Sequence, residues 1–184
     1  MVKYYLIKMS LLYKDMVIIV ELIKSITYIA VLGIAAHYIG ESLPRRWFVC
    51  DRFPFKPYFW ENNGKIYNLV GVKRWKNRVP DMSKIMKDML PKRIGIHATS
   101  ESVDRLIKET CVAEVVHKIL CVLSIGVYFI WKNTVGAILS GVCIICNLPF
   151  IIIQRFNRPQ LMALKVKLQI REEKKRNAVS DTVM

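Results

Sequence analysis

The sequence predicts an all-α membrane protein with about three transmembrane helices and a basic cytoplasmic segment between the first and the second. Hydrophobic residues make up 53% of the 184 residues and gather in blocks, which is atypical of a soluble domain. The chain has 29 Lys+Arg against 14 Asp+Glu, a net charge of +15. Together with the apolar blocks, this charge indicates an anionic membrane surface as partner. Nucleic acid is disfavoured because no recognition motif is present. We expect a single integral membrane domain over residues 1–184.

Three apolar runs are each long enough to cross a hydrocarbon core of ~30 Å, at residues 16–39, 111–131 and 135–153. Backbone groups in lipid must bond within their own segment, so the runs should be helices. Lys132-Asn-Thr134 separates the last two, which predicts a tight helical hairpin. Pro149 is expected to kink the third helix or to mark where it leaves the membrane.

The first run has a rival interpretation as a cleavable signal peptide. Gly33-Ile-Ala35 resembles a small-x-small cleavage site. The apolar stretch before it is interrupted by Glu21 and Lys24, which are close enough on a helix to pair. We therefore favour a retained helix.

Basic residues are unevenly distributed along the chain. Fifteen lie in residues 41–110 and eight in the tail at 154–184. Three spans place both regions on one side, and the positive-inside rule makes that side cytoplasmic. The N-terminus is then expected outside and the C-terminus in the cytoplasm.

The segment between the first two spans has local signals of its own. Asn63-Gly64 lies between aromatic and β-branched residues in 59–67, which predicts a β-hairpin with a tight turn. Residues 102–110 have helical periodicity and lead directly into the second apolar run. That helix should therefore begin in the cytoplasm and enter the membrane.

The start of the second span contains ionisable residues, which are rare in membrane-spanning helices. Glu114 and His117 are neighbours on a helix, and Glu109 lies on the same side. Such groups normally face a bundle interior or a water-filled cavity. A histidine beside a carboxylate suits a general base. The alternatives are a structural hydrogen-bond network, or a Glu-x-x-His metal site for which further ligands cannot be placed. We predict no metal.

Two further clusters suit the binding of phosphate or carboxylate groups. At the end of the third span, Arg155 and Arg158 are suited to bidentate bonds, although basic anchoring is the simpler interpretation. Trp75 and Lys76 lie in a basic stretch suited to anionic headgroups or to a phosphorylated acyl carrier. The remaining polar residues chosen from these clusters are Asp81, Asn147, Gln154 and Asn157.

The cysteines give little sign of chemistry. Four of the five lie in apolar runs, so a secreted disulfide framework is not indicated. Cys143 and Cys146 form a C-x-x-C without a second pair, and we interpret them as small apolar residues of a membrane helix.

These blocks, in this order, resemble the glycosyl-diaponeurosporenoate acyltransferases, the last enzymes of staphyloxanthin-type carotenoid synthesis in bacteria. The likeness covers about Gly40 to Leu161, and Phe156 replaces a tyrosine of the family. The matching blocks are Pro44 and Phe48, Glu61-x-x-Gly64-Lys65, Trp75-Lys76…Asp81, Glu109-Thr110-x-x-Ala113-Glu114-x-x-His117 and Asn147-x-Pro149…Gln154-Arg155-Phe-Asn157-Arg158-Pro159-x-Leu161.

The resemblance implies transfer of a fatty acyl group onto a sugar hydroxyl of a membrane-embedded glycolipid or carotenoid glycoside. In this hypothesis His117 deprotonates the hydroxyl with support from Glu114 or Glu109. The donor is an acyl thioester, acyl-CoA or acyl carrier protein, from the cytoplasm, and no cofactor is expected. The arginines, Trp75 and Lys76 would hold the donor's phosphates or the developing oxyanion. Asn147, Gln154 and Asn157 would position donor or acceptor.

Two other hypotheses remain open from the sequence. One is a non-enzymatic membrane assembly or binding protein whose basic face grips anionic lipid. It predicts that charge matters while the identity of His117 does not. The other is a different lipid-modifying transferase on the same scaffold.

Overall fold

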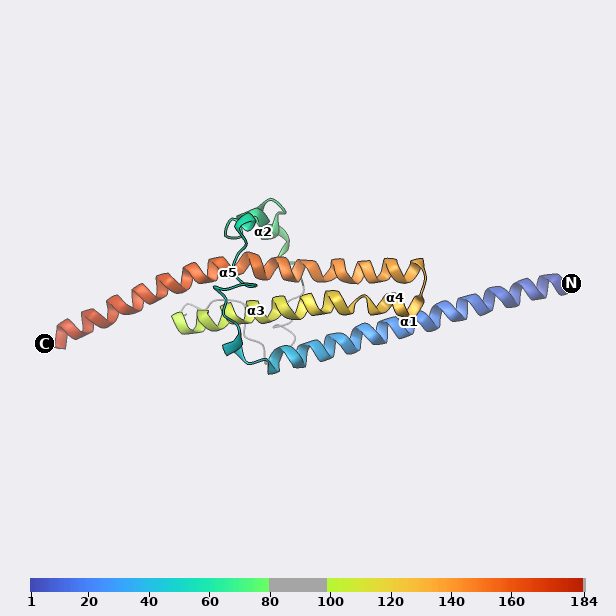
Figure 1. The fold of residues 1–184 in the computed structure, drawn as a ribbon, viewed down its shortest axis with the longest axis horizontal. Coiled ribbons are helices and arrows are strands. Elements are labelled where there is room, and N and C mark those ends of the chain that lie inside the picture. The colour runs from blue at the N-terminus through green and yellow to red at the C-terminus, as the bar shows by residue number, and fades with distance from the viewer. Residues whose placement is uncertain (80–98, 184) are drawn as a thin grey trace. The chain divides into compact units, whose positions relative to one another are not determined.

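The computed structural model describes residues 1–79 and 99–183 and is helical throughout its regular parts (Figure 1). Three helices are long and apolar enough to cross a membrane, namely Lys3–Ser42, Ser100–Trp131 and Thr134–Asp181. The chain is thus a membrane protein, as predicted. The elements in chain order are α1 (Val2–Ser42), η1 (Arg45–Trp47), η2 (Phe59–Glu61), η3 (Lys65–Asn68), α2 (Val72–Trp75), α3 (Ser100–Leu123), α4 (Gly126–Trp131) and α5 (Thr134–Val183).

The long helices extend well beyond the apolar runs that predicted them. The prediction that the second span begins as a polar helix is confirmed, since α3 starts at Ser100. The basic tail is helical too, as the second half of α5. It is tied to the start of α3, because Glu172 accepts hydrogen bonds from the backbone N–H (2.8 Å) and the hydroxyl (2.6 Å) of Ser100. Lys165 and Asp104 form an ion pair of 2.6 Å between the same two helices.

Helix α5 continues through both of its prolines, Pro149 and Pro159. Pro149 therefore does not end the helix, and the prediction that the helix leaves the membrane near it stays a prediction. A proline in a helix leaves the carbonyl four residues earlier without its usual donor, and membrane helices tolerate this when other groups approach. For Pro159 that carbonyl belongs to Arg155. The backbone of Gly64 lies against it, since a β-carbon at Gly64 would be 3.6 Å from the Arg155 oxygen.

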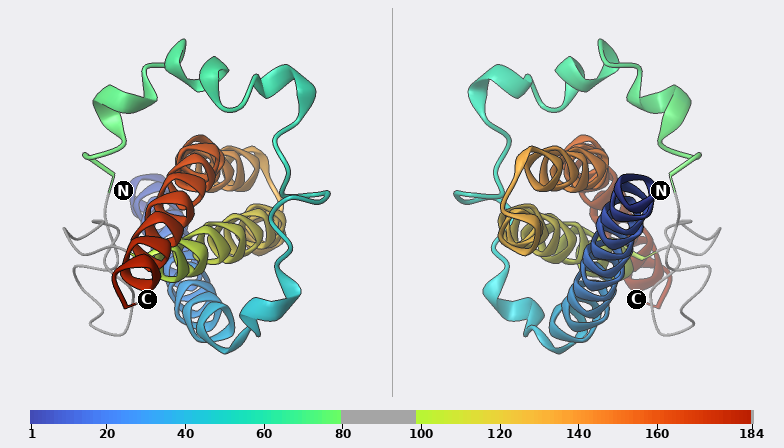
Figure 2. Two further views of the ribbon diagram at one scale, coloured as in Figure 1. Left: turned by 90° about the vertical axis from the view of Figure 1, so that its left-hand side faces the viewer. Right: turned by 90° about the vertical axis from the view of Figure 1, so that its right-hand side faces the viewer.

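The β-hairpin predicted at residues 59–67 is wrong, because the described residues contain no strand. Asn63-Gly64 does form a tight turn, but the turn joins the 3₁₀ helices η2 and η3. Asn62, Asn63 and Gly64 all have positive φ (46°, 54° and 84°). Bonds between residues three apart, such as Gly64 N–H to Glu61 C=O (2.9 Å), then wind the chain instead of extending it. Figure 2 shows this region as a succession of short helical turns.

The described residues form two compact units. The first unit comprises Met1–Ser42 and Lys118–Asn147. Here the Tyr28 hydroxyl donates to the Leu123 carbonyl (2.9 Å). Gly126 and Tyr28 are packed closely, since a β-carbon at Gly126 would require the Tyr28 side chain to move. Two further bonds in this unit are Trp131 Nε1 to Ser25 Oγ (2.8 Å) and Ser140 Oγ to Ser124 O (2.8 Å).

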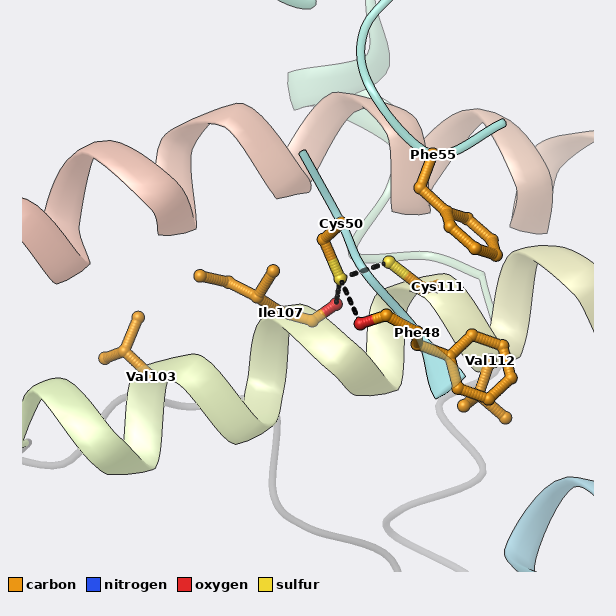
Figure 3. Packing of buried hydrophobic residues seen from close by; sticks show 7 residues of the cluster. All are labelled: Phe48, Cys50, Phe55, Val103, Ile107, Cys111 and Val112. Carbon is orange, nitrogen blue, oxygen red and sulfur yellow. Dashed lines mark hydrogen bonds between the residues drawn. The ribbon is translucent and has the colours of Figure 1, made fainter. Parts of the chain in front are cut away.

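The second unit comprises Leu43–His117 and Leu148–Met184. One apolar cluster joins the segment after α1 to α3. In it Phe48, Cys50 and Phe55 pack with Cys111 and neighbouring α3 residues, and the thiols of the two cysteines are in contact (Figure 3). A second cluster joins η3 and α2 to α5 through Tyr67, Val72, Ile153 and Phe156. The short turns are therefore packed on the two long helices of this unit.

Candidate functional site

A buried cluster of four charged side chains lies in the second unit, and we call it the charge network. It consists of Glu61, Glu114, Arg155 and Arg158. Glu61 comes from η2, Glu114 from α3 and the arginines from α5. The arginines are three residues apart, so they lie on the same face of their helix. All four are buried, with Glu114 fully inaccessible. Two positive and two negative charges balance, as buried charges require.

Arg155 bridges the two carboxylates of the charge network. Its guanidinium makes a bidentate pair with Glu61, with Nε bound to Oε1 and Nη2 to Oε2 (2.9 Å). Its Nη1 donates to Glu114 Oε1 at 2.7 Å. The carbonyls of Pro54 (3.2 Å) and Lys56 (3.3 Å) accept further bonds. Arg155 thus fixes the segment before η2 against both long helices.

Arg158 holds the other oxygen of Glu114. Its Nη2 donates to Glu114 Oε2 at 2.6 Å and to the Thr110 carbonyl at 3.0 Å. Its Nε donates to the Thr110 hydroxyl at 2.9 Å, and its Nη1 to the Phe55 carbonyl at 2.7 Å. Two guanidiniums therefore grip one carboxylate, which fixes the rotation of α3 at this level.

Glu61 is kept ionised by its partners. Burial alone would raise the pKa of Glu61, but hydrogen bonds from Arg155, Tyr67 and the Tyr58 backbone outweigh it and hold the pKa below its usual range. Burial and the hydrogen bond to the Glu61 carboxylate raise the pKa of Tyr67. Tyr67 therefore stays a neutral donor to Glu61.

Aromatic rings cover both arginines. The Arg155 guanidinium lies 4.3 Å from the ring centre of Tyr58, and that of Arg158 lies 5.6 Å from Phe55. Such cation–π contacts strengthen where water is excluded. Tyr58 in turn contacts the rings of Phe53 (6.5 Å) and Trp60 (5.8 Å).

His117 lies one helical turn after Glu114 on α3 and is half-buried. Its ring stacks on that of Phe150 from α5, with centroids 4.5 Å apart and planes 9° apart. The stacking fixes the plane of the imidazole. Glu109, the third predicted catalytic residue, makes a bidentate pair with Arg45 (2.8 and 2.9 Å).

Lys76 lies at the accessible edge of the site. Its ammonium donates to Asn157 Oδ1 at 3.2 Å and lies 5.0 Å from the ring centre of Phe156. Burial, together with the charge of Lys73, lowers the pKa of Lys76. The neighbouring Trp75 is half-buried, and its indole N–H donates to the Val70 carbonyl (3.0 Å).

The remaining predicted binding residues do not all lie in the second unit. Gln154 is buried in the second unit, whereas Asn147 belongs to the first unit, where its side-chain amide donates to the Cys143 carbonyl (2.9 Å). Asp81 lies outside the described residues. Across residues 1–79 and 99–183 no group of three or more His, Cys, Asp or Glu residues is arranged to hold a metal ion.

Sequence reasoning did not select Glu61, Tyr67, Arg45 or Thr110 as site residues. Glu61 and Thr110 do occur in the blocks that carried the family resemblance, and that was a usable signal for both. Nothing in the local sequence marks Tyr67 or Arg45. Arg45 pairs with Glu109, 64 positions away, and Tyr67 donates to Glu61, which was itself not selected.

Comparison with known proteins identifies the family. A family model described as glycosyl-4,4'-diaponeurosporenoate acyltransferase matches residues 44–167, which include the whole charge network and His117. The chain belongs to this acyltransferase family. Membership makes the chain an enzyme, an acyltransferase, and favours that hypothesis over the non-enzymatic binding protein.

Similar relatives are proteins of Staphylococcus aureus named glycosyl-4,4'-diaponeurosporenoate acyltransferase. Those of strains RF122 and MRSA252 are each 29% identical to this chain over 137 residues, which is 74% of this chain and 82% of the relative. The relative from strain N315 is 28% identical over the same length. No solved structure matches.

Proposed function

We propose that this acyltransferase moves a fatty acyl group from a thioester donor to a sugar hydroxyl of a glycosylated carotenoid or similar glycolipid. The acceptor class follows from the name of the relatives, which describes acyl transfer to a glycosyl carotenoid acid. One observation supports the assignment of the chemistry to a residue. His117 lies one turn after a carboxylate that two guanidiniums hold fixed, and its ring is stacked on Phe150.

In the proposed reaction His117 acts as the general base. Its neutral imidazole takes the proton of the acceptor hydroxyl as the oxygen attacks the thioester carbonyl carbon. The tetrahedral intermediate then breaks its carbon–sulfur bond, and the proton returns to the leaving thiolate. The products are an acyl ester of the sugar and a free thiol, so no oxidant, reductant or metal is needed.

The charge network is assigned a positioning role. Arg155 and Arg158 are buried and engaged by Glu61 and Glu114, so contact with a donor phosphate would require them to leave carboxylates. Losing a buried partner is costly. We therefore assign these arginines and Glu114 to holding α3, and with it His117, in place. Glu109, paired with Arg45, is assigned the same kind of task further back along α3.

Lys76 and Trp75 are the better candidates for contact with the donor. Both are half-buried, and the Lys76 ammonium donates to the side-chain oxygen of Asn157. An ammonium in a partly desolvated place attracts phosphate or a developing oxyanion more strongly than one in water. Gln154, Asn147 and Asp81 stay candidates for positioning donor or acceptor.

The donor is proposed to come from the cytoplasm. The positive-inside rule assigns the basic second unit to that side, with the N-terminus outside. Acyl-CoA and acyl carrier protein both carry a phosphorylated pantetheine-type thioester on that side of the membrane. The basic stretch around Lys76 suits either donor.

The test is acyl transfer by purified protein in proteoliposomes that contain a glycosylated carotenoid acid, with acyl-CoA and acyl carrier protein supplied in separate reactions. His117→Ala should lower turnover by about 10²–10⁴-fold, the usual contribution of a general base. His37→Ala is the matched control, since His37 is a half-buried histidine of α1 that contacts Tyr38 and has no role in the proposal.

Turnover by His117→Ala equal to that of the wild type would remove His117 as the base. If the wild type showed no turnover with acyl-CoA and none with acyl carrier protein, the thioester donor class would be refuted. Activity with one thioester alone would name the donor.

A further inference from the structure

The short turns of the second unit expose several large apolar side chains. Phe59 is 96% exposed, Leu69 87% and Phe53 82%. Trp60 and Val70 are at least half exposed as well. These five residues, which we call the aromatic rim, lie outside the membrane-spanning helices. Exposed apolar patches outside a span indicate a surface that is covered by something.

The position of the rim along α5 indicates its depth. The apolar run of α5 ends at Ile153, and polar Gln154 follows. Ile66 and Trp75, on either side of the Leu69–Val70 turn, pack with the cluster that contains Ile153, while Ile152 also contacts it. A residue packed on the last apolar turn of a span lies at the edge of the hydrocarbon core. The polar interface there is about 5–8 Å thick on each side.

The Phe53, Phe59 and Trp60 side of the rim is fixed at the next turn of α5. Tyr58, whose ring contacts both Phe53 and Trp60, lies over the Arg155 guanidinium. Two residues after Ile153 advance α5 by only about 3 Å. Both parts of the rim therefore lie within roughly one helical turn of the membrane boundary.

The surroundings of the rim carry positive charge. Lys56, Lys65, Lys73 and Arg74 are all exposed and lie between or beside the rim residues in the chain. Aromatic and aliphatic side chains interspersed with lysine and arginine are typical of segments that lie in the headgroup region of an anionic bilayer. The charge, the depth and the apolar exposure of the rim thus all favour the headgroup region of an anionic bilayer as what covers it.

We propose that the aromatic rim is inserted into the headgroup–acyl boundary of the bilayer, with the basic residues on anionic headgroups. The second unit is then anchored to the membrane through its turns as well as through its helices. Tyr58 lies over the Arg155 guanidinium of the charge network, so the proposed insertion holds the site at headgroup depth. The inference depends on the chain being a membrane protein and not on the identity of its acceptor.

The test is photo-crosslinking of full-length protein in vesicles of phosphatidylglycerol and phosphatidylethanolamine. p-Benzoylphenylalanine replaces Phe59 in one variant and Leu69 in another, and both positions are exposed enough to accept it. Ile138, exposed within the apolar part of α5, is the lipid-facing reference. Val179 is the matched control, since it is exposed on the same helix about 39 Å beyond Ile153 along the axis.

Lipid adducts are counted by mass spectrometry of the irradiated protein. Adducts at positions 59 and 69 should come within about threefold of those at 138 and exceed those at 179 by about tenfold or more, as interfacial insertion requires. Adducts at 59 and 69 no more abundant than at 179 would overturn the proposal. Crosslinked dimers in place of lipid adducts would overturn it as well, because a second copy would then cover the rim.

Discussion

In the first unit Tyr28, Trp131 and Ser140 bond across helices through neutral groups, whereas the second unit contains a network of buried charges. Tyr28, Trp131 and Ser140 each contribute a single bond from a hydroxyl or an indole. The Lys24–Glu21 ion pair of the first unit lies within one helix, and its lysine is more than half exposed. The charge network of the second unit instead links three elements through buried ion pairs.

In the proposed function, this difference means that the second unit holds the reacting residue through its buried charges. Neutral bonds between apolar helices are individually weak, so many can be lost without loss of the fold. A buried charge network is costly to break and permits few arrangements. We propose that the charge network holds His117 in place, and the region matched by the family model contains both.

The largest expected effect is that of Glu114→Ala. The substitution leaves two buried guanidiniums facing a cavity, so the free energy of unfolding should fall by about 3–5 kcal/mol, the usual cost of removing one partner of a buried pair. Thermal unfolding in detergent, followed by circular dichroism, measures it. A melting temperature within a degree or two of the wild type would contradict the structural role of the charge network.

Next in size is a pH effect at Glu61. Its pKa is held below the ordinary value in the folded protein, so the ionised form stabilises the fold at pH above about 4.3. That stabilisation is lost as the pH falls through the depressed pKa. The difference in unfolding free energy between wild type and Glu61→Gln should therefore be full at neutral pH and shrink in acid. A difference that is constant from neutral to acid pH would show that the Glu61 charge is not what stabilises the fold.

The smallest effect is expected in the first unit. Tyr28→Phe removes the hydroxyl that bonds to the Leu123 carbonyl and leaves the rest of the ring in place. Such bonds in membrane proteins contribute about 0.6 kcal/mol on average. Unfolding in detergent should thus change by less than about 1 kcal/mol, and turnover should be unaffected. If Tyr28→Phe lowered the free energy of unfolding as much as Glu114→Ala does, the proposed difference between the two units would be wrong.

The sequence alone predicts the helices better than their connections. Long apolar runs specify spans, and the polar start of α3 was visible in its periodicity. The turn at Asn63-Gly64 was recognised, but its partner elements were not, because a tight turn can join 3₁₀ helices as well as strands. The sequence did not predict that the helix would continue without interruption through Pro149 and Pro159 into the basic tail.

The candidate site was predicted in part and for a physical reason. An ionisable residue within an apolar run must have partners, so Glu114 stands out in the sequence. Arg155 and Arg158 were selected for a different reason, their suitability for bidentate bonds to phosphate or carboxylate groups. Which residues pair cannot be deduced, because Glu61 and Arg155 are 94 positions apart. The structure shows that both oxygens of Glu114 are bound to arginines.

The most direct measurement is an untargeted comparison of lipid extracts from cells that make glycosylated carotenoid acid and express wild type, His117→Ala or an empty vector. An acylated product should appear with the wild type alone, while the protein level and melting temperature of His117→Ala match those of the wild type. The mass of the product would name the acyl group. The same acylated product from His117→Ala in equal amount would contradict the central claim that His117 performs the chemistry on a site held by the charge network.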